Sequence, residues 1–286
     1  MQCRKLRRSV ALLNKHRPPL AARRSVTHNA GPFCERLAMK IRYFSDLHFD
    51  VATDPPARVP SIGEDVVVLA GDIDRGVRGI EWARAAIPDR PVLYVLGNHE
   101  FFGGDWLTMV DAARAAAAGS QVQVLEHDAL VLGGVRFVGA TLWTGFDLCP
   151  PAERDAAIAA AEKLMVDYRR IGNGDLPLRP SDVAARCFAS RSWLTRTLPE
   201  SALPTVVISH HSPSLANEHP RFAGGISGGA FHNALDALFQ PPLRAWISGH
   251  THHSGRVEVN GIPLLSNQRG YPREALPFDW DCCLTV

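Results

Sequence analysis

Short apolar runs alternate with amphipathic stretches along most of this chain. Runs of about five residues, rich in valine, isoleucine and aromatic residues, are typical of buried β-strands. They occupy residues 41–45, 66–70, 92–96, 122–125, 135–139, 205–209, 245–248, 256–259 and 263–266. The last two flank Asn260-Gly261, a dipeptide that favours a tight hairpin turn. Apolar residues recur with helical spacing in residues 80–87 and 106–118.

The order of these elements predicts the fold class. Strands and helices alternate at first, strands then dominate, and the alternation resumes toward the C-terminus. Two sheets packed face to face, with helices on the outside, satisfy this order. We therefore expect an α/β fold built on a two-sheet β-sandwich flanked by helices.

Residues 145–200 interrupt this order. Pro150-Pro151 and the acidic residues within 153–155 predict a helix that runs to about Arg170. Glycine and proline in residues 172–180 predict a loop, and Ser181-Asp182 favours the start of a second helix that ends near Leu198. This helical insertion is either an ordinary connection within one domain or a lid over a functional site, and the sequence favours neither.

Charge is distributed unevenly along the 286 residues. Residues 1–38 hold nine Lys/Arg and one acid, whereas the whole chain has a net charge of +2, so residues 39–286 carry −6. We expect residues 1–38 to be a disordered basic leader and residues 39–286 to form one domain. The leader is either a targeting segment, resembling an organelle transit peptide, or is not translated. The second alternative is favoured because a strand begins directly after Met39.

Cysteine spacing, hydropathy and charge indicate the cellular compartment and the class of partner. The six cysteines form no CxxC pair, so we expect neither a zinc finger nor a disulfide framework, and a reducing cytoplasm fits best. No apolar run approaches the ~18 residues of a membrane span. The acidic body argues against long nucleic acids as partners, because a groove that binds nucleic acid is basic.

Five polar blocks carry the chemistry of the sequence. Each follows a predicted strand, and ligands collect at the carboxyl ends of strands in open α/β sheets. The blocks are Asp46-Leu47-His48, Gly71-Asp72-Ile73-Asp74, Gly97-Asn98-His99-Glu100, Ser209-His210-His211 and Gly249-His250-Thr251-His252. Residues two positions apart on an extended segment point to the same side. Asp46 with His48, and His250 with His252, can therefore hold one ion between them.

The remaining residues of the blocks offer ligands for a second ion. Asp72 has two carboxylate oxygens and can bridge two cations, Asn98 offers a carbonyl oxygen, and His210 an imidazole. Nitrogen and oxygen ligands of this kind suit Mn, Fe or Zn better than Ca or copper(I). His210 is preferred to its neighbour His211 because it comes first after the strand. The blocks therefore predict a pair of metal ions.

In these blocks the sequence resembles the calcineurin-like metallophosphoesterase superfamily. The pattern of that superfamily is D-x-H, GDxxD, GNH[DE], a later histidine and GHxH, in this order. The resemblance covers about residues 39–286, and segments 44–48, 142–143, 219–222 and 267–271 also resemble a little-characterised bacterial branch. It implies a four-layer α/β/β/α sandwich, with the helical insertion at about 145–200.

The resemblance also implies roles for individual residues. Site one would consist of Asp46, His48, Asp72 and His252, and site two of Asp72, Asn98, His210 and His250. Asp72 would be the bridge, and His99 a hydrogen-bond donor near the leaving-group oxygen. In phosphoprotein phosphatases, residues that correspond to Asp74 and Arg75 orient the catalytic histidine and grip phosphate. The GDxxD block is one residue shorter in this chain, which leaves both of these roles open.

The implied function is metal-dependent hydrolysis of a phosphate mono- or diester. Two divalent or trivalent ions (Mn, Fe or Zn) would clamp the phosphoryl oxygens while a hydroxide that bridges them attacks in line. The implied partner is a small phosphate-ester substrate. Two alternatives stay open: a phosphoprotein phosphatase, and a non-catalytic binding scaffold on the same fold.

Overall fold

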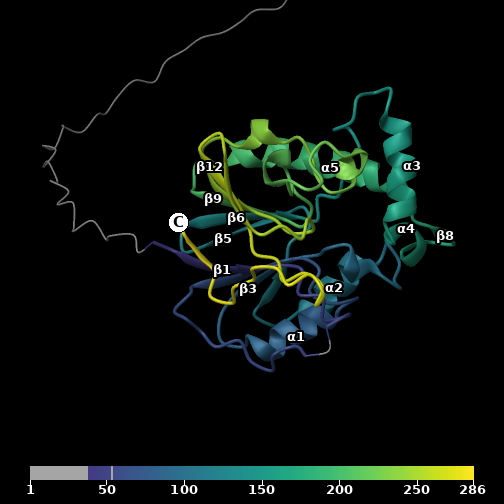
Figure 1. Ribbon diagram of the computed structural model, residues 1–286. Coiled ribbons are helices and arrows are strands. Elements are labelled where there is room, and N and C mark those ends of the chain that lie inside the picture. The colour runs from purple at the N-terminus through teal and green to yellow at the C-terminus, as the bar shows by residue number, and fades with distance from the viewer. Residues whose placement is uncertain (1–37, 53) are drawn as a thin grey trace, which may run out of the picture. The chain divides into compact units, whose positions relative to one another are not determined.

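Two β-sheets carry the fold in the computed structural model, which describes residues 38–52 and 54–286 (Figure 1). The expected basic leader lies outside the described residues, apart from Ala38. The first sheet has the order β13–β1–β2–β3–β4, in which β1 to β4 are parallel and β13 is antiparallel to β1. Its strands are β1 (Lys40–Phe44), β2 (Val66–Ala70), β3 (Val92–Val95), β4 (Val122–Val124) and β13 (Cys283–Thr285).

The second sheet has the order β11–β12–β10–β9–β6–β5, with four parallel central strands and an antiparallel strand at each edge. Its strands are β5 (Asp128–Leu132), β6 (Val135–Ala140), β9 (Thr205–Ser209), β10 (Leu243–Ile247), β11 (Gly255–Val259) and β12 (Ile262–Ser266). The expected hairpin turn joins β11 to β12, and both Asn260 and Gly261 have positive φ. Positive φ at both central residues is typical of the two-residue turn whose twist matches that of the strands it joins.

The strands pack as a sandwich, which confirms the predicted fold class. Between the sheets, buried side chains of β1 and β2, such as Ile41 and Val68, pack in one core with Phe137 of β6 and Ile208 of β9. Helices α1 (Arg78–Ala86) and α2 (Met109–Ala117) cover the outer face of the first sheet, and α5 (Pro180–Thr197) covers that of the second (Figure 1). Both faces of the central strands are therefore apolar, which explains their unbroken hydrophobic runs.

The insertion is split into more elements than the sequence predicts. The first predicted helix is α3 (Arg154–Leu164), followed by a separate turn, α4 (Asp167–Arg170), and the predicted loop holds the short hairpin β7 (Gly172–Asn173) and β8 (Leu176–Pro177). Backbone hydrogen bonds tie the insertion to the segment after β3, since the Gly103 amide donates to Arg170 and the Trp106 amide to Gly172. Helix α5 belongs to the core, so this half of the insertion is an ordinary connection.

Short 3₁₀ turns complete the described elements. They are η1 (His99–Phe101), η2 (Leu198–Glu200), η3 (Leu215–Asn217), η4 (Ile226–Ala230) and η5 (Asp236–Leu238). Among the described residues, none of the helices has both the length and the apolar composition that crossing a membrane requires.

Candidate metal centre

The polar blocks meet at one edge of the two sheets. Asp46, Asp72 and Asn98 follow the carboxyl ends of β1, β2 and β3, whereas His210 and His250 follow those of β9 and β10. Backbone hydrogen bonds join the blocks to one another: the Asp46 amide donates to Gly71, the His48 amide to Asp72, and the Gly249 amide to His210. Segments far apart in the sequence are thereby fixed side by side.

Glycine is required in the blocks because the backbone passes very close to the side chains of the predicted ligands. A Cβ atom at Gly97 would lie 2.1 Å from Asp72 Oδ1, and one at Gly249 would lie 2.5 Å from Asp46 Oδ2. At Gly71, where φ is also +88°, a Cβ atom would lie 2.5 Å from His210 Nδ1. Only glycine lets the backbone pass this close to the ligand side chains.

Five of the seven predicted ligands have a left-handed backbone. Their φ angles are 53° for Asp46, 49° for His48, 55° for Asp72, 69° for His250 and 48° for His252. For residues other than glycine, this conformation costs of order 1–3 kcal/mol each and persists only where the surrounding structure imposes it. Strain concentrated on one set of polar side chains is typical of a functional site.

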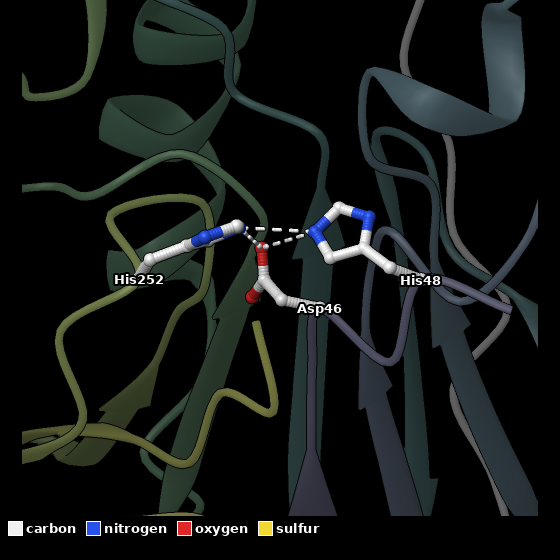
Figure 2. A group of neighbouring side chains, drawn as sticks. All are labelled: Asp46, His48 and His252. Atoms are coloured by element: carbon white, nitrogen blue, oxygen red, sulfur yellow. Dashed lines mark hydrogen bonds and ion pairs between the residues drawn. The ribbon is translucent and has the colours of Figure 1, made fainter. Parts of the chain in front are cut away.

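One cluster of ligand atoms is formed by Asp46, His48 and His252 (Figure 2). Asp46 Oδ1 lies 3.6 Å from His252 Nε2 and 3.9 Å from His48 Nε2, and the two Nε2 atoms are 3.0 Å apart. Ligands that share an ion at ~2.0–2.2 Å lie roughly 3–4 Å from one another, depending on the angle between them. The three side chains are therefore spaced like the ligands of one metal ion.

A second cluster contains Asp72, His210 and His250, with Asn98 beside it. His210 Nε2 lies 3.4 Å from Asp72 Oδ1 and 3.1 Å from Asn98 Oδ1. His250 Nε2 is buried and has no hydrogen-bond partner among the described residues. Burial, together with the neighbouring His211, holds the pKa of His250 well below its usual value, so the imidazole is neutral. A neutral, unpartnered imidazole fits a metal ligand.

Asp72 lies between the two clusters. Its Oδ1 faces His210, whereas its Oδ2 lies 3.9 Å from His48 Nε2 in the first cluster. Burial opposes ionisation, but His210 and His99 hold the pKa of Asp72 well below its usual value. An ionised carboxylate with one oxygen toward each cluster has the arrangement of a bridging ligand.

A family model for calcineurin-like phosphoesterases matches residues 39–254. The chain belongs to this family. An uncharacterised protein of Acanthamoeba polyphaga mimivirus is 24% identical over 270 residues, which cover 84% of this chain and 94% of that protein. The solved structure of a phosphopantetheinyl hydrolase from Mycobacterium tuberculosis superposes with a TM-score of 0.69 at 19% identity, over 87% of this chain and 96% of that one. At this identity the likeness shows a shared fold.

The side-chain Nδ1 of His99 in this calcineurin-like phosphoesterase contacts Asp50, a residue outside the predicted set. His99 Nδ1 lies 3.2 Å from Asp50 Oδ2, and the same oxygen accepts a hydrogen bond from Arg75 Nε. Asp74, whose family counterpart orients the histidine, instead accepts hydrogen bonds from the Arg75 amide and from Arg78. The D-x-H block of this chain reads Asp46-Leu47-His48-Phe49-Asp50, and this additional carboxylate is the signal that could have revealed the contact.

The Nε2 atom of His99 lies between Asp72 and Tyr271 of the C-terminal segment. This atom is 3.8 Å from Asp72 Oδ2 and 3.1 Å from the Tyr271 hydroxyl. Burial works against the protonated form, but Asp72 and Asp50 raise the pKa of His99 above its usual value. The side chain can therefore carry a proton toward the centre.

The carboxylate of Glu100 fixes the backbone of the site. It accepts hydrogen bonds from the amides of Asp72, Ile73 and Gly97 and from the Tyr94 hydroxyl. Burial, and the charge of Asp72, raise the pKa of Glu100 to about 7. The last residue of the Gly97-Asn98-His99-Glu100 block thus supports the loops that carry the ligands.

Asp167, from α4 of the insertion, orients Asn98. Asn98 Nδ2 donates to Asp167 Oδ1 at 2.9 Å, which leaves Asn98 Oδ1 facing His210. Burial raises the pKa of Asp167 to about 6. The sequence offered no signal for this contact, because a single aspartate in a helical insertion has no distinguishing spacing.

His211 lies outside both clusters. Its Nδ1 faces the carbonyl of Thr141 at 3.3 Å, and its ring packs against Trp143. Burial and the adjacent His210 lower the pKa of His211 to about 3. The structure thus brings His210, and not His211, to the ligand cluster.

The C-terminal loop supports His252. Its Nδ1 contacts Glu274 Oε2 at 2.6 Å, and its amide donates to Gln268 Oε1. The same Glu274 oxygen accepts from the Tyr271 amide. Such contacts fix which imidazole nitrogen faces an ion, and the sequence did not reveal them.

Proposed function

We propose that this protein is a metal-dependent phosphoesterase that hydrolyses a phosphate mono- or diester at a centre of two ions. The observation that carries the proposal is the position of Asp72, with one carboxylate oxygen toward each ligand cluster. Asp46, His48 and His252 would hold the first ion with Asp72. His210, His250 and Asn98 would hold the second. The nitrogen and oxygen donors fit Mn, Fe or Zn.

When bound, two such ions would polarise the phosphoryl oxygens and lower the pKa of a water molecule, so that a hydroxide nucleophile is available near neutral pH. The residues of the chain supply orientation and a proton. His99 presents Nε2 to the centre while Asp50 fixes its other nitrogen. In this position His99 protonates or hydrogen-bonds the departing oxygen, a contribution of about 10²–10⁴-fold for acid catalysis.

A small phosphate ester is the proposed substrate. The fold is shared with a phosphopantetheinyl hydrolase, and we extend the hydrolytic role, not that substrate, to this chain. Arg75, which would grip phosphate in a phosphoprotein phosphatase, is engaged by Asp50. This contact argues for a small ester over a phosphoprotein.

A cytoplasmic location stays a prediction from the cysteine pattern.

The test is turnover of p-nitrophenyl phosphate and bis(p-nitrophenyl) phosphate by the full chain with added Mn²⁺. Asp72→Asn is expected to lose at least about 10²-fold in kcat, because one bridging charge is removed. Asp128→Asn, an exposed aspartate on β5, serves as the matched control and should match the wild type. Equal rates for Asp72→Asn and the wild type would refute the proposal. A chain that binds no Mn²⁺ would instead indicate a non-catalytic scaffold.

A further inference from the structure

A small cavity of about 210 Å³ borders the second ligand cluster. Its apolar lining consists of Phe231 and of two side chains that are more than half exposed, Leu164 at the end of α3 and Phe222. Thr251, which stands between His250 and His252 in the sequence, also lines it. Pockets that bind whole drug-sized ligands measure about 300–1,000 Å³. This cavity therefore has room for one substituent of a substrate.

Three walls connect the cavity to ligands of the second cluster. The ring centroid of Phe231 lies 5.2 Å from that of His250, and Thr251 directly follows His250 in the chain. Leu164 stands three residues before Asp167, which holds the Asn98 amide. A group bound in the cavity would thus lie beside the proposed phosphate position.

The remaining walls give the cavity its chemical character. His219 and His232 add two more rings. Burial lowers the pKa of His232 to about 4, so this ring is uncharged at neutral pH. Glu218 also lines the cavity, and in the described part of the chain its carboxylate has neither an ion pair nor a hydrogen bond. Among the described residues, the lining of the cavity contains no lysine or arginine. Arg221, whose guanidinium lies 5.7 Å from the Phe222 ring, is outside this lining.

We propose that this cavity binds an organic ammonium group of the substrate, such as the head of an amino alcohol esterified to phosphate. Aromatic faces attract such cations, and recognition of quaternary ammonium groups by several rings is a common use of this attraction. The unpaired carboxylate of Glu218 adds a charge of opposite sign. The inference rests on the proposed phosphoesterase function, since it assigns the substrate class of the same site.

The position of the cavity also selects the type of ester. His99 reaches the Asp72 oxygen that faces the first cluster, whereas Phe231 contacts His250 of the second. The leaving group belongs on the side of His99, so the cavity holds the substituent that stays on phosphorus. The substrate class is therefore a phosphodiester. The oxygen of water forms a bond to phosphorus and gives up one proton to the solvent, while the bond to the leaving oxygen breaks. The leaving oxygen takes a proton from His99, which regains one from the solvent, and the ammonium alcohol remains esterified.

The test compares two chromogenic diesters with the same leaving group. One is p-nitrophenyl phosphorylcholine, and the other is the diester in which a carbon atom replaces the choline nitrogen, so that this substituent has no charge. For the wild type with Mn²⁺, kcat/KM should be roughly ten-fold higher for the choline ester. Glu218→Gln and Phe222→Leu should each bring the ratio close to one. Glu153→Gln, a nearby acidic residue outside the lining, should keep the wild-type ratio. Equal kcat/KM values for the two esters in the wild type would overturn the inference.

A binding measurement separates this inference from the proposed function. Choline and its carbon analogue are titrated into the full chain and followed by ligand-observed NMR, which needs no turnover. Preferential binding of choline that is lost in Glu218→Gln would support the cavity assignment even if neither diester is hydrolysed. Hydrolysis of bis(p-nitrophenyl) phosphate without any preference for choline, in rate or in binding, would support the phosphoesterase and reject the ammonium site.

Discussion

The carboxylate of Asp50 lies 3.2 Å from Nδ1 of His99 and is completely buried as a side chain. Burial disfavours its charge, yet contacts with His48, His99 and Arg75 hold the pKa of Asp50 well below its usual value. Asp50 is thus ionised and fixes both the orientation and the tautomer of His99. Asp50, and not Asp74, is therefore the carboxylate that contacts His99 in this chain.

Asp50→Asn is expected to slow hydrolysis in a way that depends on the leaving group. A good leaving group such as p-nitrophenolate needs little help from His99, whereas phenolate needs a proton. We expect kcat to fall roughly ten-fold for p-nitrophenyl phosphate and about 10²–10³-fold for phenyl phosphate. Asp74→Asn, the residue the family pattern would favour, is the control and should change both rates equally and little. A uniform loss in Asp50→Asn would mean that Asp50 is only structural.

The strands and the ligand blocks were predictable because their signals are local. Both β2 and β9 were predicted with their observed bounds, because each contains an apolar run rich in β-branched residues. The edge strand β5 escaped prediction because its residues are partly exposed and begin with Asp128. The short β13 forms only by pairing with β1 from the opposite end of the chain. Such long-range pairing leaves no pattern in a single segment.

The same contrast holds within the site. His48, Asp72 and His210 could be predicted because each stands in a short block at the end of a strand, and the structure brings them together. Asp50 and Asp167 act through contacts that depend on how separate loops pack. Asp50 stands two residues after His48, so its place in the block hints at a role, whereas no spacing along the chain marks Asp167.

Removal of the Asp167 carboxylate should weaken the second ion site. Without Asp167 the Asn98 amide loses the partner that keeps its Oδ1 toward His210. Loss of a residue that orients a metal ligand costs about 10–100-fold in metal affinity. In Asp167→Ala, titration calorimetry with Mn²⁺ should therefore show one weakened site and one unchanged site. Asp175→Ala, an exposed aspartate of the same insertion, is expected to bind as the wild type does. Equal weakening of both sites would contradict the assignment.

Gly97→Ala should damage both the centre and the stability of the fold. Its methyl group would overlap Asp72 Oδ1 and also lie 2.5 Å from the Asp72 amide, so the backbone must shift. We expect a loss of about 1–3 kcal/mol in the free energy of unfolding, as for other overpacked sites, and loss of bound metal. Chemical denaturation and metal analysis measure the two effects. Gly255→Ala is the control, because a Cβ atom there meets nothing within 4 Å. Normal metal content in Gly97→Ala would contradict the overlap of a Cβ atom at position 97 with the Asp72 carboxylate.

A buried cluster of Glu64, Arg42 and Arg90, away from the candidate metal centre, makes the free energy of unfolding depend on pH. Glu64 Oε1 lies 3.1 Å from Arg42 and 2.7 Å from Arg90, and its other oxygen accepts from the Ile62 amide. Burial alone would raise the pKa of Glu64, but the hydrogen bonds from backbone amides and from Arg42 lower it from 4.5 to about 2.

Because the pKa of Glu64 is lower in the folded chain than in the unfolded chain, its contribution to stability is complete above about pH 4.5. It is lost progressively as the pH falls from 4.5 toward 2. Glu64→Gln should cost about 1.5–3 kcal/mol at pH 7, since two buried guanidinium groups lose a charged hydrogen-bond acceptor while Arg42 keeps Asp281 and Arg90 keeps Asp89. The difference between wild type and variant, measured by urea unfolding, should shrink as the pH falls through this window. In Glu81→Gln, an exposed glutamate on α1, no such dependence is expected. A difference for Glu64→Gln that stays constant from pH 7 to pH 3 would show that Glu64 titrates alike in the folded and unfolded chains.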